Sequence, residues 1–483
     1  LVSCLIMSES EKEEEKEDEK NVNITSPSFL IKNLNLLGAS VSYTSLNDIL
    51  DDVFFKIDNG DLVVDDIRFE GIDNFSLRPR DISFKYNKSF SLDYFSTETI
   101  SSIEGDLKVE DLIIRSNLGL MKASGVVTNE EGSLTGRLED LTLDVDINNS
   151  FIDFHQLGSV LPGLSNQKWY DKSDIGKIFI NGHLSGSLDD LSLLESQIVI
   201  PKLVTYAGDI DISNFENPES ALINITMDQS KIHLDKINKR IPNIKIPDEV
   251  QRLGEVNITG QFDGFKDNFV AEAILKSELG ELVFDLNFDI SEDNQYSGLL
   301  DLNSFDLGVL LNAKDVGKIS LSADITEGRG LELENIEATF SADIDTFQFK
   351  GYTYTNAIFN GQMSNKSVDG AFKVHDGTID FDFDGRLDFS TDIPNAKFKI
   401  DINHIDLCQA NLTNFPCEVS LNASIDMYGK ELNDIQGTAI LDSIFMKKDE
   451  EELYLDYLNI SSTSVDQGML LDVASDELDA KIR

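Results

Sequence analysis

The stretch Thr378-Ile379-Asp380-Phe381-Asp382-Phe383-Asp384 alternates strictly between apolar and polar side chains. In a β-strand successive side chains point to opposite faces, so Ile379, Phe381 and Phe383 share one face and the aspartates share the other. A strand with one apolar and one wet face is typical of antiparallel sheets. This stretch therefore predicts an antiparallel strand whose apolar face must be covered by something.

The same alternation recurs through the chain after Val22, for example in Lys397–Asn403, Leu282–Ile290 and Ile319–Ile325. Gly, Asn and Asp interrupt it every 8 to 14 residues, as hairpins and meanders require. We therefore predict a mainly β protein. Helical patterns are scarce, and the expected short helices are Phe151–Leu161, Phe305–Leu311, Ile405–Leu412 and, in an otherwise loop-like stretch from Asp235 to Arg252, Asp248–Leu253.

One strand pattern is repeated within the chain. Gly176–Leu191 aligns without gaps on Gly254–Phe269, and shorter copies occupy Gly317–Thr326 and Glu418–Asp426. The copies are unevenly spaced, whereas solenoids keep a fixed period. A small residue recurs in mid-strand, which usually marks a bend or a close backbone approach. The repeat thus favours a long meandering sheet with a varying number of strands between copies.

Charge and composition exclude several classes of protein. The 483 residues include 88 acidic and 40 basic side chains, for a net charge of −48. A polyanion of this kind repels phosphate, so we expect no nucleic-acid partner. Three Cys cannot build a disulfide scaffold, and no apolar run approaches the roughly 20 residues of a membrane-spanning helix. Most of the charge belongs to the outward half of the alternating pattern.

The chain has two regions of different composition. Residues 1–22 begin with Leu1-Val2-Ser3-Cys4 and contain the run Glu9–Lys20, which has eight acids and three lysines. We interpret them as a truncated leader and an acidic disordered or helical segment, and the chain as part of a longer protein. No linker divides residues 23–483, which we expect to form one continuous unit.

A sheet of this length needs an unusual solution for its apolar face. A sandwich or a closed barrel of about 460 residues would be too long as one domain. An elongated, strongly curved antiparallel sheet would instead form an apolar groove, and the natural guest of such a groove is a lipid acyl chain. A series of ordinary β-sandwich domains explains the pattern equally well at this point. The candidate groove residues are Leu282, Phe284, Leu286, Phe288, Ile319, Leu321, Ile379, Phe381, Phe383, Phe398, Ile400 and Ile402.

No motif of the sequence predicts catalysis, so we expect neither an enzyme nor a cofactor. The five His lack zinc-ligand spacing, and no nucleophile elbow, Walker loop or dinucleotide fingerprint is present. Asp380–Gly385 matches half of an EF-hand loop, but Thr391 stands where the bidentate Glu is needed; we expect no metal site there. Cys408 and Cys417 either form a local disulfide or are free thiols.

The second half of the chain contains a series of strand and turn motifs in a fixed order. They are Gly254–Gly264, Ser304–Leu311, Gly351–Gly361, Asp369–Phe372, His375–Gly385, Leu387–Phe389, Pro394–Phe398 and Ile405–Leu407. This order resembles the translocation and assembly module TamB family of Bacteroidota, within the AsmA-like superfamily. The resemblance covers roughly residues 140–483 and is a pattern of strands and turns.

This resemblance implies a periplasmic, bridge-like lipid-transfer protein of a Gram-negative envelope. It implies phospholipid as the cargo and a long β-groove between inner and outer membranes that supports outer-membrane biogenesis. It further implies an inner-membrane anchor outside this chain and, through a missing C-terminal part, an outer-membrane insertase-type barrel as partner. The family has no catalytic residue to carry over.

Two other functions stay open on sequence grounds. One is a non-enzymatic surface or adhesion protein of β-sandwich domains. The other is an assembly chaperone for outer-membrane or secreted β-proteins, which would pair client strands with an exposed sheet edge.

Overall fold

The computed structural model describes most of the chain beyond its first 27 residues. The described residues are 28–44, 53–86, 90–129, 140–167, 169–171, 173–187, 189–214, 217, 219–242, 244–290, 294–330, 335–430, 434–465, 468–476 and 479–482. The expected leader and acidic segment, residues 1–22, lie outside them.

The described residues form 27 strands and five short helices. The first strands are β1 (Phe29–Thr44), β2 (Val53–Gly71), β3 (Asn74–Tyr86), β4 (Phe90–Ser96), β5 (Thr99–Ile103), β6 (Asp106–Ser116), β7 (Gly119–Asn129), β8 (Leu141–Asp153), β9 (Lys177–Ser187), β10 (Asp190–Ile200), β11 (Val204–Ser213), β12 (Leu222–His233), β13 (Glu255–Gly264) and β14 (Asn268–Ser277). The remaining strands are β15 (Gly280–Asp289), β16 (Gln295–Asp306), β17 (Val316–Arg329), β18 (Glu337–Phe349), β19 (Tyr352–Ser364), β20 (Ser367–His375), β21 (Ile379–Asp388), β22 (Asn395–Asp406), β23 (Cys417–Tyr428), β24 (Gln436–Lys448), β25 (Glu451–Val465), β26 (Gly468–Ser475) and β27 (Asp479–Ile482). The helices are α1 (Phe154–Leu157), α2 (Pro162–Ser165), α3 (Leu234–Arg240), α4 (Asp248–Gln251) and α5 (Leu307–Leu311).

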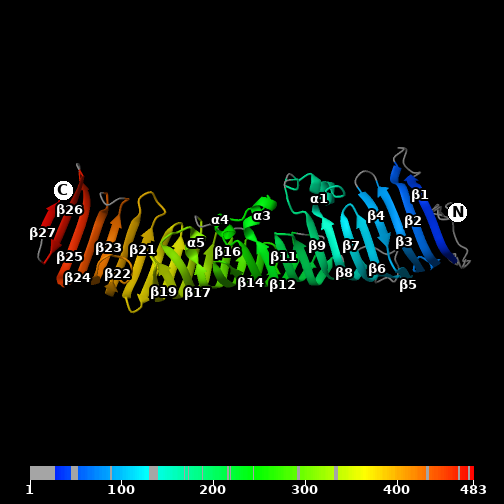
Figure 1. Ribbon diagram of the computed structural model, residues 1–483. Coiled ribbons are helices and arrows are strands. Elements are labelled where there is room, and N and C mark those ends of the chain that lie inside the picture. Colours follow the sequence, from blue (N-terminus) through cyan, green and yellow to red (C-terminus); the bar gives the residue numbers. More distant parts are fainter. Residues whose placement is uncertain are drawn as a thin grey trace, which may run out of the picture.

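All 27 strands belong to a single antiparallel sheet. Each strand pairs with the next along the chain, except that β3 and β6 each pair with both β4 and β5. The result is the long strip of Figure 1, with β1 at one end and β27 at the other. The prediction of one elongated antiparallel sheet is therefore confirmed.

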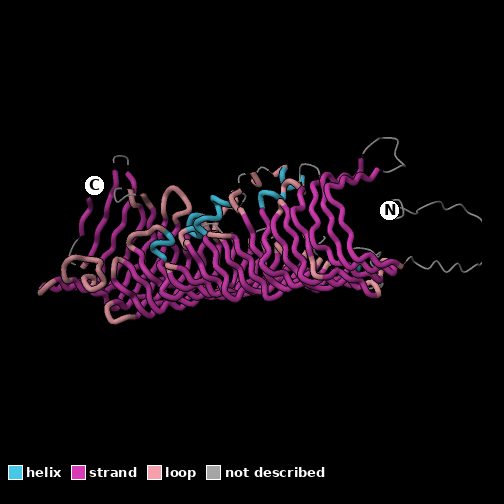
Figure 2. The backbone as a smooth tube through the Cα atoms, turned by 45° about the vertical axis from the view of Figure 1, so that its right-hand side comes forward, coloured by secondary structure: helices cyan, strands magenta, loops and turns pink. Residues whose placement is uncertain are grey.

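The two long edges of the strip differ. Connections from β8 to β9, β12 to β13 and β16 to β17 are the ones that contain the helices, and they all emerge on the same side because the strands alternate in direction. Figures 1 and 2 show these helices following one long edge of the sheet. We call this side the helix edge and the other the opposite edge.

β-Bulges in mid-strand bend the sheet. Asp111, Asn149, Glu195 and Ser304 adopt positive φ at register shifts on even-numbered strands. A neighbouring strand satisfies the extra N–H; Asp209 Oδ1, for example, accepts from Glu195 N at 2.6 Å. Bulges bend a strand and increase its twist, and Figure 2 shows the strands turning upward from a densely packed lower part.

The sequence repeat has a structural meaning. Its four copies are β9, β13, β17 and β23, the strands that return from the long connections of the helix edge. Gly176 and Gly254, which open the first two copies, have φ of +71° and +67° and turn the chain into the strand. Three, three and five strands lie between successive copies, so the number of strands between copies varies, as predicted, and the longest spacing has the most strands.

The expected helices are partly right. Leu307–Leu311 and Asp248–Gln251 are helical within the predicted ranges, and Phe154–Leu157 is the helical part of the third, which is otherwise strand and turn. The predicted helix Ile405–Leu412 is wrong, since the strand continues to Asp406 and turns follow. The stretch read as loop after Asp235 instead holds α3. No helix of the described part is long and apolar enough to cross a membrane.

Candidate functional site

Cross-strand register places one apolar row along almost the whole sheet. Residues that pair across neighbouring strands point to the same face, and every member of this central row is apolar or glycine. The central row is Leu77, Ile100, Val109, Gly125, Val145, Leu184, Leu193, Ile210, Ile225, Phe262, Ala271, Leu286, Gly298, Ile325, Phe340, Gly361, Gly370, Gly385, Phe398, Ile425, Ala439, Ile460, Val473 and Ala480.

Two further apolar rows lie on the same face, nearer the helix edge. The second row is Gly260, Ala273, Phe284, Leu300, Ala323, Ala342, Phe359, Phe372, Phe383, Ile400, Ala423, Leu441 and Leu458. The third row is Ile258, Leu275, Leu282, Leu302, Leu321, Ile344, Ala357, Val374, Phe381, Ile402 and Leu421. The small residues of the repeat, Gly182, Gly260, Ala323 and Ala423, each precede a central-row residue by two positions.

All twelve candidate groove residues lie on this apolar face. Leu286 and Phe398 belong to the central row. Phe284, Phe383 and Ile400 belong to the second row, and Leu282, Leu321, Phe381 and Ile402 to the third. Ile319 and Ile379 lie one row nearer the helix edge, and Phe288 lies one row nearer the opposite edge. Eleven of the twelve are partly buried, and Ile379 alone is buried, with 2 % of its surface exposed. Packing against a second sheet would bury such residues almost completely. Over most of its described length the face is therefore an apolar surface without a second layer.

Phenylalanine pairs across strands give this face much of its apolar area. The ring centroids of Phe262 and Phe269 are 4.6 Å apart, and those of Phe269 and Phe288 are 4.9 Å apart. Farther along, the ring centroids of Phe383 and Phe398 are 5.1 Å apart, with the ring planes tilted by 35°. Such pairs stabilise neighbouring strands beyond simple burial. They also leave a continuous aromatic and aliphatic lining.

The face is hollowed near its first third. A depression of about 290 Å³ over β6–β9 is lined mainly by aliphatic side chains, among them Ile114, Met121, Ile147 and Ile180. Small residues make room for it; Gly119 in particular approaches the backbone oxygen of Phe151 so closely that a Cβ would clash with it.

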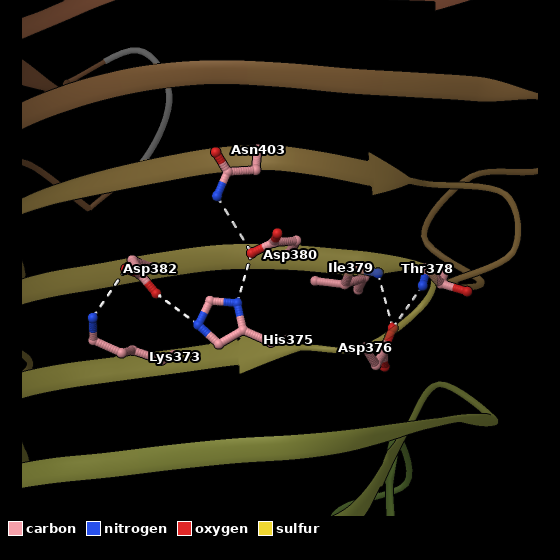
Figure 3. Close-up of polar contacts among 8 residues, drawn as sticks. All are labelled: Lys373, His375, Asp376, Thr378, Ile379, Asp380, Asp382 and Asn403. Carbon is pink, nitrogen blue, oxygen red and sulfur yellow. Dashed lines mark hydrogen bonds and ion pairs between the residues drawn. The ribbon is translucent and has the colours of Figure 1, made fainter.

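The other face of the sheet is charged, and Figure 3 shows part of it. His375 lies between Asp380 and Asp382 of the next strand, with Nδ1–Oδ1 and Nε2–Oδ1 distances of 2.6 and 3.4 Å. Lys373 Nζ lies 3.0 Å from Asp382 Oδ2. Hydrogen bonding from His375 lowers the pKa of Asp380. The alternating aspartates thus share the charged face, as the pattern predicted, and Asp380 and Asp382 are also ion-paired with the neighbouring strand.

A second histidine repeats this arrangement on the same face. His183 Nδ1 is 2.8 Å from Asp146 Oδ1, and Nε2 is 3.5 Å from Asp144 Oδ1. The hydrogen bond with Asp146 raises the pKa of His183. Within the described ranges, no group of three or more His, Cys, Asp and Glu side chains is arranged to hold a metal ion.

One part of the apolar face is closed, which the sequence did not predict. The connection 407–416 folds back so that Ala410 is fully buried against Tyr354, Ala357, Val374 and Ile379. Tyr354 Oη donates to Ala410 O at 3.4 Å, and burial raises the pKa of the Tyr354 phenol. Ile379 is therefore a core residue rather than part of an accessible lining.

The two cysteines beside this closed part are free thiols. Cys417 is buried, Cys408 is partly buried, and Leu407 N donates to Cys417 O at 2.9 Å. The alternative of a local disulfide is thus not realised in the structure.

No model of a protein family, no curated protein and no solved structure matches the chain.

Proposed function

We propose that this chain is a section of a periplasmic, bridge-like lipid-transfer protein of the TamB type, which carries phospholipid acyl chains along its apolar face. The observation that supports the proposal is the unbroken central row. It offers an apolar path across 24 residues of successive strands with no polar side chain in it.

The length of the sheet suits a continuous path for lipid better than a single binding site. Strands in a sheet are about 4.8 Å apart, so the described sheet is on the order of 120 Å long. The hydrocarbon core of a bilayer is only about 30 Å thick. Each acyl CH₂ moved from water onto the face gains about 0.8 kcal/mol, and this gain is similar at each step along the row. A uniform gain holds the lipid without trapping it at one place.

The rival functions receive less support. An adhesion protein of β-sandwich domains needs pairs of sheets packed face to face, whereas the described strands all belong to one sheet. A chaperone that acts by strand addition needs unpaired strand edges, whereas strands β2–β26 are each paired on both sides. The periplasmic location, the inner-membrane anchor and the outer-membrane barrel partner stay predictions from the resemblance. The proposed transfer requires no catalytic group or cofactor.

A photo-crosslinking pair tests the proposal. Benzoylphenylalanine replaces Phe398 in the central row or, as a matched control, the adjacent Lys399, which is exposed on the charged face. The purified chain is incubated with phospholipid vesicles, irradiated and analysed by mass spectrometry. We expect phospholipid adducts at position 398 and none at 399. Adducts at 399 alone, or equally at both positions, would contradict the proposal.

A further inference from the structure

One segment of the helix edge is basic in a chain whose net charge is −48. Among the described residues, the connections of the helix edge from β8–β9 to β24–β25 contain eight basic and ten acidic residues. Those of the opposite edge, from β7–β8 to β25–β26, contain three basic and six acidic residues. The net charge of the two edges is therefore similar, and the helix edge is distinguished by where its basic residues lie.

The positive charge of the helix edge is concentrated at α3 and α4. Residues 234–254 hold five basic and three acidic side chains. One of the acids, Glu249, is paired with Arg252 at 3.3 Å. Arg252 also donates to Leu310 O at 2.6 Å and so links α4 to α5.

This segment is held in place by its own hydrogen bonds. Asn238 exchanges two bonds with the backbone of Ile246, at 2.7 and 2.8 Å. Arg240 donates to Pro201 O at 2.6 Å and to Asp174 O at 2.7 Å. The connection between α3 and α4 is thereby fixed beside the turn from β10 to β11.

Three lysines are left exposed around this fixed segment. Lys239 and Lys245 belong to it, and Lys202 follows Pro201 in the adjacent turn. None of the three has an ion pair or side-chain hydrogen bond within the described part of the chain. Ile244, beside Lys245, exposes 46 % of its surface. Cations next to exposed apolar surface at the border of an apolar face match an amphiphile with a negative headgroup.

We propose that the α3–α4 part of the helix edge binds the anionic headgroup of a lipid whose acyl chains lie on the apolar face, through Lys202, Lys239 and Lys245. This inference rests on the proposed lipid-transfer function and adds the class of headgroup and its place. Phosphate and ammonium groups form charge-assisted hydrogen bonds. Each lysine near an anionic lipid surface strengthens binding by about fivefold.

A lipid-competition experiment tests this assignment. The purified chain is exposed to vesicles of phosphatidylcholine and phosphatidylglycerol in equal parts, and the protein-bound lipid is extracted and quantified by mass spectrometry. We expect phosphatidylglycerol to be enriched over phosphatidylcholine by more than the roughly fivefold that one lysine supplies. The variant K239Q/K245Q, which keeps Lys202, should lose most of this enrichment while it still binds phosphatidylcholine. High salt should reduce the enrichment of the unmodified chain, because it screens exposed charges.

The matched control makes the same charge change at the opposite edge. Lys366 and Lys430 are exposed there without ion pairs among the described residues, and K366Q/K430Q should keep the full enrichment. Enrichment that survives K239Q/K245Q, or that is lost equally in both double variants, would overturn the headgroup site. Equal binding of both lipids by the unmodified chain would overturn the headgroup site but leave the lipid path intact. Binding of neither lipid would overturn the proposed function itself.

Discussion

Two parts of the same apolar face behave differently. Where connection 407–416 folds over the third row and the row beside it, Ala357 and Val374 of the third row and the neighbouring Ile379 expose 1 %, 0 % and 2 % of their surface. In the central row, Leu286 and Phe398 stay partly exposed although their strands have the same alternation. Periodicity therefore decides which side chains share a face, and a single connection decides whether that face becomes a protein core or an open surface.

The largest loss of stability should come from a substitution in the part of the apolar face that connection 407–416 covers. Ile379→Ala removes a fully buried side chain and leaves a cavity, so we expect the free energy of unfolding to fall by about 3 kcal/mol. Phe398→Ala removes more carbon atoms but from a partly exposed position, and should cost about 1 kcal/mol. Urea-induced unfolding of both variants gives the comparison. A larger loss for Phe398→Ala would mean that the open part is covered in solution.

The connection itself can be tested next. Ala410→Asp places a carboxylate where no water reaches, so the connection should detach at a cost of about 2 kcal/mol. Detachment would uncover Val374 and Ile379 and increase the fluorescence of a bound hydrophobic dye. Leu412→Asp in the same connection is the control, since Leu412 is already 39 % exposed and should change stability by less than about 0.5 kcal/mol. Equal effects of the two substitutions would show that the connection does not act as a cover.

The smallest effect on stability should come from the charged face, through the ionisation of His183. Hydrogen bonding to Asp146 raises the pKa of His183 above its ordinary value of 6.5. Such a group stabilises the folded state fully below pH 6.5, and the contribution disappears as the pH rises through the higher folded pKa. An NMR titration of the His183 ring should show the raised pKa, and Asp146→Asn should lower it. An unchanged pKa in that variant would assign the shift to Asp144 and Glu195 instead.

The strands and their apolar face follow from period two alone, because a half-buried strand must alternate. All twelve candidate residues therefore lie on one face, although nothing local tells which of them a distant connection will cover. Connection 407–416, which covers Ile379, is an example of a structure that local sequence does not predict. Asp406 Oδ1 accepts from Cys408 N and Gln409 N at 3.0 Å, as a helix N-cap would. Asn411 then adopts a φ of +58° and ends the turn before a helix forms.

The helix α3 was not predicted, because the prolines that follow it are typical of a loop. Pro242 follows two residues after its end and Pro247 precedes α4, so the sequence resembles a loop. Seven residues between β12 and these prolines are nevertheless helical. The side-chain bonds of Asn238 and Arg240 that hold the segment join residues up to 66 positions apart, and no local pattern records them.

The consecutive pairing of strands has a consequence for folding. Outside β3–β6, each strand pairs only with its neighbours along the chain. The stability of a strand therefore depends on local hairpins and on the two interfaces that it forms, much as in a repeat protein. Contacts close in sequence require little loop closure, which favours rapid assembly despite the β architecture. Such a sheet can start folding at several hairpins and grow by the addition of strands on both sides. It can begin to fold while the later strands are still being synthesised.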